Sequence, residues 1–182
     1  MKELADAQRV GKHVTELADQ IKKAISARKG EWAMIGIRSR GDLLAERLAE
    51  LVGREQFKDR VGNLDITLYR DDLSEVAAQP IVQTTEIPFD VDSKDVVLVD
   101  DVLMTGRSIR AALSSLMDFG RPRRVWLAVL VDRGGRELPI AADFVALDLS
   151  KGAEGLGEND HVQVLLQETD GKDAVEVRVA NK

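Results

Sequence analysis

Cysteine is absent from the 182 residues, which excludes disulfide bonds, cysteine-ligated zinc or iron–sulfur sites and a catalytic thiol. Aromatic residues are scarce, at 4%, whereas 32% of the residues are charged, a composition typical of soluble globular proteins. Long apolar runs are missing too: the longest, Val125–Val131, is far shorter than the roughly 20 residues of a membrane-spanning helix. The first residues, with Lys2 and Glu3, do not resemble a signal peptide. We therefore expect a cytoplasmic protein with no membrane partner.

Basic residues are outnumbered by acidic ones, 26 against 32, which gives a formal net charge of −6. This balance argues against a uniformly basic nucleic-acid-binding protein but is compatible with a local basic patch. At roughly 100–200 residues per domain, the length predicts one domain over residues 1–182. A domain of this size buries enough surface to fold without a disulfide or a metal.

Hydrophobic periodicity predicts helices and strands that alternate through the middle of the chain. Helices are expected over 3–28, from Asp42 to about Gly53, and around 109–117; strands are expected at 32–37, 64–69, 96–99, 125–131 and 144–147. Near the C-terminus, Val162 to Leu166 and Val175 to Val179 alternate as a hairpin across an Asp170–Gly171 turn. Alternating strands and helices are typical of an α/β fold with a mostly parallel sheet flanked by helices.

The segment after the third predicted strand is the richest in chemistry. Asp100 and Asp101 end the strand, and Thr105 to Ser108 then open a helix, where exposed N–H groups and hydroxyls suit a phosphate. Two carboxylates followed by an anion site suit a ligand with a phosphate at one end and hydroxyls or a metal at the other, such as a ribose 5-phosphate. An acidic pair also occurs in magnesium and phosphoacceptor sites, and Thr105–Ser108 could be a plain helix cap. The spacing matches neither a Walker loop nor a dinucleotide-binding fingerprint.

Four segments carry a family resemblance. Residues 97–108 (VLVDDVLMTGRS) resemble the phosphoribosyl-diphosphate (PRPP) signature of type I phosphoribosyltransferases. Residues 36–41, 64–73 and 130–140 are similar to segments of one group in that family, the bifunctional pyrimidine-operon regulators with uracil phosphoribosyltransferase activity. The resemblance covers essentially the whole chain. It implies a type I phosphoribosyltransferase fold, with a small hood and a C-terminal hairpin.

The resemblance implies the reaction of uracil with PRPP to give UMP and pyrophosphate, with Mg²⁺ bridging substrate oxygens. Asp100, Asp101 and Arg40 are the catalytic candidates; both aspartates would hold the ribose hydroxyls and meet the metal only through PRPP. Arg70 would belong to a lid formed by the long polar segment after Tyr69. The substrate-binding candidates are Ser39, Arg40, Gly41, Val102, Leu103, Met104, Thr105, Gly106, Arg107, Ser108, Arg133, Asp148 and Leu149.

Departures from the family pattern keep two alternatives open. Leu147 and Ser150 stand where the family carries a lysine and a proline near the base, and a leucine donates no hydrogen bond. A phosphoribosyltransferase for another base is therefore one alternative. The family also binds pyrimidine-operon mRNA under control of UMP and UTP, so a regulator with little catalysis is the other. Ala141 stands where RNA-binding relatives carry arginine. The resemblance further implies a homo-oligomer, a dimer or larger.

Overall fold

The computed structural model describes residues 1–70, 84–151, 156–157 and 160–179. Its elements, in chain order, are β1 (Lys2–Ala5), α1 (Ala7–Ser26), β2 (Trp32–Ile37), α2 (Gly41–Val52), α3 (Arg54–Phe57), β3 (Val61–Leu64), the 3₁₀ helix η1 (Thr67–Tyr69), β4 (Asp95–Leu103), α5 (Arg107–Met117), β5 (Arg124–Asp132), β6 (Phe144–Asp148), β7 (His161–Leu165), α6 (Gln167–Asp170) and β8 (Ala174–Arg178).

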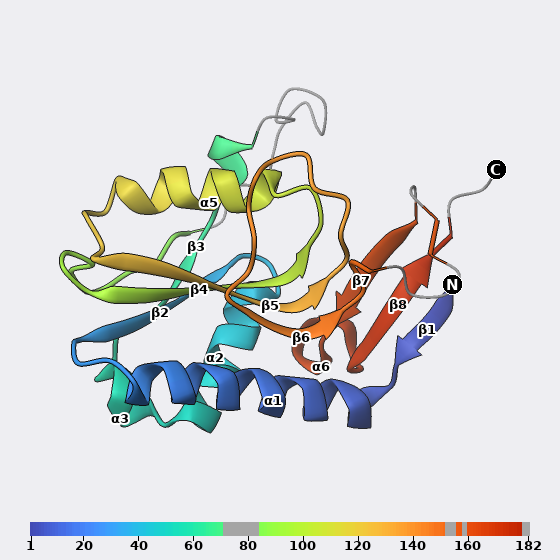
Figure 1. The fold of residues 1–182 in the computed structure, drawn as a ribbon, viewed down its shortest axis with the longest axis horizontal. Helices are drawn as coiled ribbons and strands as arrows, with labels where there is room; N and C mark the ends of the chain where they lie inside the picture. The colour runs from blue at the N-terminus through green and yellow to red at the C-terminus, as the bar shows by residue number, and fades with distance from the viewer. Residues whose placement is uncertain (71–83, 152–155, 158–159, 180–182) are drawn as a thin grey trace.

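A five-stranded parallel sheet in the order β3-β2-β4-β5-β6 forms the centre of the protein. Helices α1 and α2 cover one face and α5 covers the other (Figure 1). The central strands read as continuous apolar runs because both faces of the sheet are buried. The predicted α/β class and parallel sheet are confirmed.

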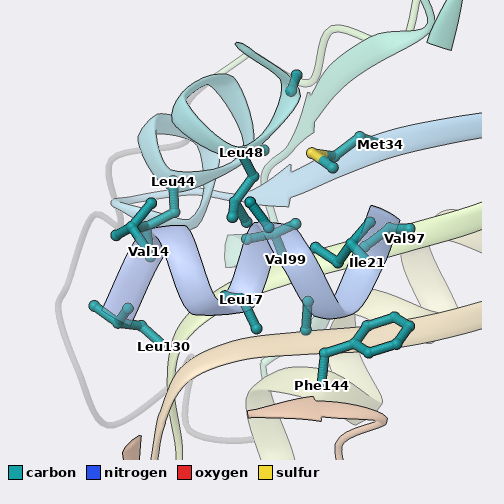
Figure 2. Packing of buried hydrophobic residues seen from close by; sticks show 14 of the residues in the cluster. Val14, Leu17, Ile21, Met34, Leu44, Leu48, Val97, Val99, Leu130 and Phe144 are labelled. Carbon is teal, nitrogen blue, oxygen red and sulfur yellow. The ribbon is translucent and has the colours of Figure 1, made fainter. Parts of the chain in front are cut away.

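Two hydrophobic clusters hold these layers together, one on each face of the sheet. On the first face, Leu17 and Ile21 of α1 and Leu48 of α2 pack against Val97 and Val99 of β4 (Figure 2). These side chains are less than 4% exposed, and burying one such side chain contributes about 1.5–3 kcal/mol. Their packing fixes where α2 begins, which matters for the site below.

A second, antiparallel sheet of three strands, β1-β8-β7, lies at one end of the parallel sheet (Figure 1). The predicted hairpin pairing is confirmed, with Val162 opposite Val177 and Val164 opposite Val175. Its connection is longer than the predicted two-residue turn, because residues 166–173 include the short helix α6. Together with β1, the hairpin supplies the small hood expected from the family resemblance.

The N-terminal residues differ from the prediction of a helix over 3–28. Lys2–Ala5 form strand β1, which pairs with β8, and α1 begins only at Ala7. The cause is Asp6, whose carboxylate accepts the N–H of Arg9 and so caps the helix. The helix continues to Ser26, and its buried stripe consists of Val10, Val14, Leu17, Ala18 and Ile21.

Three further predicted boundaries were wrong. The strand predicted at 64–69 is β3 at Val61–Leu64, and Asp65 accepts the N–H and hydroxyl of Thr67, which turns the chain into η1. Helix α2 begins at Gly41, one residue before the predicted start at Asp42, and its N-cap position is Arg40. Strand β4 continues through Asp100 and Asp101 to Leu103, because its ladder with β5 continues that far.

Among the described residues, the helices are all too short or too polar to span a membrane.

Candidate active site

The carboxyl ends of β2, β4 and β5 lie along one edge of the parallel sheet, and a cavity opens there beside the ends of β2 and β4. It has a volume of about 280 Å³ and is lined by Ile37, Arg38, Ser39, Arg40, Ile66, Arg70, Asp100, Asp101, Val102 and Ser108. Three arginines and two adjacent aspartates thus face one space. Ligands of open α/β sheets bind at this edge.

The Asp100 carboxylate is buried, with 6% of the residue exposed. It accepts the N–H of Asp101 at 3.0 Å, and Asp101 in turn accepts the N–H of Val102 at 2.8 Å. Burial, reinforced by the neighbouring Asp101 charge, raises the pKa of Asp100 well above its ordinary value. Burial also raises the pKa of Asp101, although the Val102 N–H and the charge of Arg40 oppose that shift. Such carboxylates are poised to accept hydrogen bonds from ligand hydroxyls.

The loop between β2 and α2 forms the second wall of the cavity. Its Arg38–Ser39 peptide bond is cis, and Arg40 has a positive φ of 74° at the start of α2. A Cβ at Gly41 would lie 2.5 Å from the carbonyl oxygen of Val99, so only glycine lets α2 approach β4 this closely. Gly41 therefore packs against the sheet and does not line the cavity, while Ser39 and Arg40 do.

A smaller cavity of about 60 Å³ adjoins the first and shares Val102 and Ser108 with it. Its lining is Val102, Leu103, Met104, Thr105, Gly106, Ser108 and Ile109, the predicted phosphate loop and the first turn of α5. Gly106 has a φ of 91° and occupies the N-cap position of α5, where a residue with a Cβ would be strained. The backbone N–H groups of this helix start are suited to an anion.

Arg136, which sequence reasoning had not assigned to the site, supports the phosphate loop from behind. Its guanidinium donates to the carbonyl oxygens of Met104 at 2.7 Å and Ile140 at 2.8 Å, and it pairs with Asp132. The N–H groups of residues 137 and 138 donate to the carbonyl oxygen of Thr105. The carbonyl oxygens of Met104 and Thr105 in this loop therefore accept hydrogen bonds from residues 136–138.

Besides Gly41, four predicted binding residues, Arg107, Arg133, Asp148 and Leu149, line neither cavity. Arg107 pairs with Glu137 at 2.6 Å, both about half exposed. Arg133 is buried and donates to the carbonyl oxygens of Asp160 and Gly157.

The other two residues are Asp148, which is the last residue of strand β6, and Leu149, which follows it. The Asp148 carboxylate accepts the N–H and hydroxyl of Ser150, and these bonds lower its pKa. The N–H of Leu149 donates to Asp132 at 2.7 Å, so it already has an internal partner.

Two residues that belong to the site, Arg38 and Asp170, were not among the predicted site residues, and they differ in whether a sequence motif could have identified them. Arg38 lines the cavity and belongs to the same loop as Ser39, so the loop motif could have identified it. Asp170 binds Arg40 across 130 positions of sequence, and no local pattern signals that contact. Arg70 lines the cavity, and its role in a lid stays a prediction, since residues 71–83 of the predicted lid lie outside the described residues.

Metal binding by the chain itself would need a cluster of ligating side chains. Within residues 1–70, 84–151, 156–157 and 160–179, no group of three or more His, Asp or Glu side chains forms such a cluster. The carboxylates of Asp100 and Asp101 remain suited to a hard cation that a substrate carries with it.

Comparison with known proteins gives consistent results at the levels of sequence and fold. The model of the phosphoribosyl transferase domain family matches residues 1–161. The "Bifunctional protein PyrR" of Thermus aquaticus is 48% identical over 176 residues, 96% of this chain and 94% of the relative. That of Deinococcus radiodurans is 50% identical over 180 residues, 96% and 92% of the two chains.

Among solved structures, a hypoxanthine phosphoribosyltransferase of Trypanosoma cruzi has a TM-score of 0.62 at 17% identity and covers 96% of this chain and 95% of its own. A hypoxanthine-guanine phosphoribosyltransferase of Bacillus anthracis has a TM-score of 0.62 at 18% identity, covering 81% and 83%. These two show a shared fold. With the family match and the PyrR identities, they lead to one conclusion: the chain belongs to the phosphoribosyl transferase domain family, among its bifunctional PyrR members.

Proposed function

We propose that this phosphoribosyltransferase uses uracil as its base and converts uracil and PRPP to UMP and pyrophosphate. The observation that carries the proposal is the cavity of about 280 Å³ lined by Arg38, Arg40 and Arg70 together with Asp100 and Asp101. Its arginines suit a diphosphate and its carboxylates suit vicinal hydroxyls. The adjoining cavity at the start of α5 has the size and the donors for a single phosphate.

Each part of the substrate has proposed partners. The 5-phosphate would bind the backbone N–H groups and hydroxyls of Thr105–Ser108, and the ribose hydroxyls would donate to Asp100 and Asp101. The diphosphate would lie against Ser39 and Arg40, with Arg38 and Arg70 adding positive charge from the same cavity. Three arginines and the β2–α2 loop would therefore hold the leaving group from several sides.

In the reaction, the bond between the anomeric carbon and the diphosphate oxygen breaks, and a bond from that carbon to the base nitrogen forms. The base nitrogen loses its proton, and the diphosphate keeps the bonding electron pair. Positive charge develops on the ribose ring in the transition state. The protein contributes by orienting both substrates and by stabilising the departing negative charge, with no covalent intermediate on the chain.

Mg²⁺ fits this site as a partner of the substrate. The described residues hold no protein cage for it, while Asp100 and Asp101 sit beside the space proposed for ribose and diphosphate. When bound, the ion would neutralise diphosphate charge and so favour its departure. Asp100 and Asp101 would meet it indirectly, through the oxygens of PRPP.

Base recognition is proposed to involve Arg133 and the backbone at Asp148 and Leu149. Arg133 already donates to the main-chain carbonyls of Asp160 and Gly157, so it would act on the base indirectly, by holding this main chain in place. Leu147, half-buried beside this segment, cannot donate a hydrogen bond to a base carbonyl. The main chain would then supply the polar contacts to uracil.

The proposed reaction is tested by measuring pyrophosphate released from PRPP. Release should depend on uracil and on Mg²⁺ together, and the double variant Asp100→Asn, Asp101→Asn should lose most of it. Turnover by the double variant equal to that of the unaltered chain would remove both aspartates from the ribose site.

A second activity, regulation of pyrimidine genes by binding mRNA with UMP and UTP as effectors, is proposed from the similarity to the PyrR proteins. Arg9, Lys12, Lys22 and Lys23 are exposed on α1 and could meet RNA phosphates, whereas Ala141 offers no charge. Binding to a pyrimidine-leader hairpin should be stronger with UMP and weaken with salt. No binding at low salt would leave the enzyme as the sole activity of the two.

A further inference from the structure

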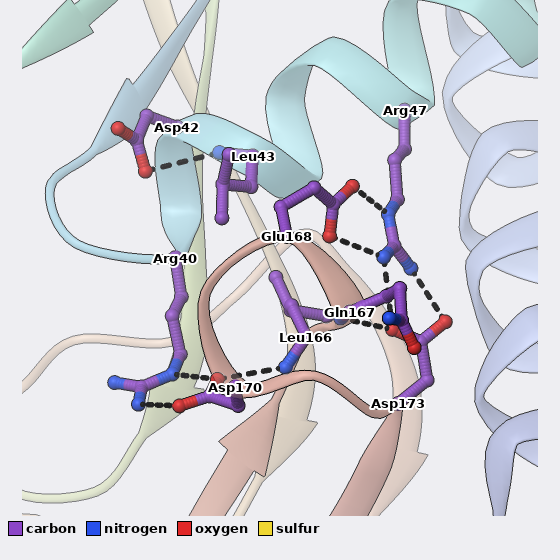
Figure 3. Close-up of polar contacts among 9 residues, drawn as sticks. All are labelled: Arg40, Asp42, Leu43, Arg47, Leu166, Gln167, Glu168, Asp170 and Asp173. Carbon is purple, nitrogen blue, oxygen red and sulfur yellow. Dashed lines mark hydrogen bonds and ion pairs between the residues drawn. The ribbon is translucent and has the colours of Figure 1, made fainter.

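The connection between β7 and β8 lies against the start of helix α2, although more than 120 residues separate them in sequence. Figure 3 shows the two arginines of this contact, Arg40 at the N-cap of α2 and Arg47 one to two turns further along. Both point toward carboxylates of the connection. The small antiparallel sheet is thereby joined to the loop that lines the cavity of about 280 Å³.

Arg40 is held by Asp170 in a two-point contact. Its Nε donates to Oδ2 at 3.1 Å and its Nη2 donates to Oδ1 at 2.8 Å, with side-chain exposures of 29% for Arg40 and 16% for Asp170. Such pairing uses one edge of the planar guanidinium and fixes its orientation. The remaining nitrogen, Nη1, points away from Asp170 (Figure 3). Arg40 also lines the cavity, and Asp170 engages only the Nε–Nη2 edge of its guanidinium.

Asp170 is itself held firmly in place. Its Oδ2 accepts the N–H of Leu166 at 2.9 Å, and its own N–H donates to the carbonyl oxygen of Leu166 at 2.7 Å. Arg47 then fastens the same connection to α2, through Glu168 at 2.6 Å and Asp173 at 2.8 Å. The carboxylate that orients Arg40 is therefore on a braced segment.

From these contacts we propose that Asp170 is a positioning residue of the diphosphate subsite, which orients the Arg40 guanidinium for the diphosphate of PRPP. The inference rests on the proposed function. A long arginine side chain normally loses rotamer freedom when it binds a ligand, which costs binding free energy. Because Asp170 already restricts the Arg40 side chain, less of this cost falls on ligand binding. Its negative charge would oppose a diphosphate if the two competed for the same guanidinium edge. The two-point contact leaves the other edge for the ligand, which favours positioning over competition.

The test compares two variants of the same connection, Asp170→Asn and Glu168→Gln. Each replaces one carboxylate with its amide, but only the first removes the ion pair with Arg40. We would measure binding of inorganic pyrophosphate in magnesium chloride buffer by calorimetry, and the KM values for PRPP and uracil. Asp170→Asn should weaken pyrophosphate binding and raise the PRPP KM about threefold to tenfold, with the uracil KM and kcat changed less. Glu168→Gln should leave these values near those of the unaltered chain.

A double-mutant cycle separates positioning from general loosening of the fold. In an Arg40→Ala background, Asp170→Asn should have little further effect on pyrophosphate binding, because its only proposed route is through Arg40. Equal binding by Asp170→Asn and the unaltered chain, tighter binding by the variant, or additive effects in the cycle would each overturn the inference. Failure of the unaltered chain to bind pyrophosphate or to release it from PRPP would instead overturn the proposed function, and this inference with it.

Discussion

At the scale of single residues, the site concentrates charge where the fold would otherwise bury apolar groups. Asp100 is 6% exposed and lies beside a second carboxylate, so its ionised form is held at a cost to stability. Arg136 is the opposite case, since its donors are matched by carbonyls and a carboxylate. Both residues yield predictions that separate function from stability.

Asp100→Asn should stabilise the fold while impairing turnover. Because the folded-state pKa of Asp100 is raised, the cost of its charged form is absent below the unfolded pKa near 4 and appears as pH rises through the folded value. Urea unfolding at pH 8 should show a higher free energy of unfolding for the variant than for the unaltered chain. The gain should vanish by about pH 4. A variant less stable than the unaltered chain at pH 8 would contradict this account.

Arg136→Gln should raise the KM for PRPP by about tenfold, because the phosphate loop loses the donors that hold the Met104 and Ile140 carbonyls. Steady-state kinetics with PRPP and uracil varied separately would measure it. Glu137→Gln is the matched control: it removes the exposed ion pair with Arg107 between the same two segments and should change KM little. Equal effects of the two variants would show that Arg136 has no special role.

At the scale of elements, the positions of α2, α5 and the β7–β8 connection determine which side chains meet in the cavity. Helix α2 approaches β4 so closely that Gly41 has no room for a Cβ. This contact sets Ser39 and Arg40 at the cavity wall. The connection after β7 then reaches α2 through Arg47 and Arg40.

Gly41→Ala should destabilise the protein by about 1–3 kcal/mol, because the new methyl group would meet the Val99 carbonyl oxygen. Gly11→Ala is a control from the middle of α1, where a Cβ would have no neighbour within 4 Å. That substitution should stabilise by about 0.5–1 kcal/mol through helix propensity. Thermal unfolding of both would decide, and a neutral Gly41→Ala would argue against the close helix–sheet contact.

Arg47→Gln should loosen residues 166–173 and lower stability by about 1 kcal/mol, a value reduced by solvent screening of partly exposed pairs. Hydrogen bonds from Arg47 lower the pKa values of Glu168 and Asp173, so their contribution is present above the unfolded pKa near 4. It is lost as pH falls through the lower folded values. The difference between the two chains should therefore be largest at neutral pH and shrink in acid, in unfolding curves taken across that range.

The sequence predicted the elements that have local signals, such as apolar runs and motifs. It did not predict structure that depends on pairing with residues far away in the chain. Apolar runs identified β2 and β5, and the PRPP signature identified Asp100 and Asp101. Lys2–Ala5 was misread because its strand conformation depends on pairing with β8 at the other end of the chain. The contact of Asp170 with Arg40 could not be foreseen for the same reason.

At the scale of the whole molecule, one parallel sheet brings three loops to a common edge, and a small antiparallel sheet fastens to that edge from the side. The two adjoining cavities at that edge have charges suited to a phosphorylated sugar with a diphosphate leaving group. We propose that residues 1–182 act as one domain in this respect, because Asp170 in the connection of the small sheet holds Arg40, which lines the cavity of the parallel sheet.

Pyrophosphate release from PRPP, measured with Mg²⁺ and one base at a time (uracil, hypoxanthine, guanine or orotate), tests the proposed reaction. We expect turnover with uracil and little with the other three. Preference for a purine or for orotate would contradict the proposed base, and no release with any of the four would contradict the proposed enzyme.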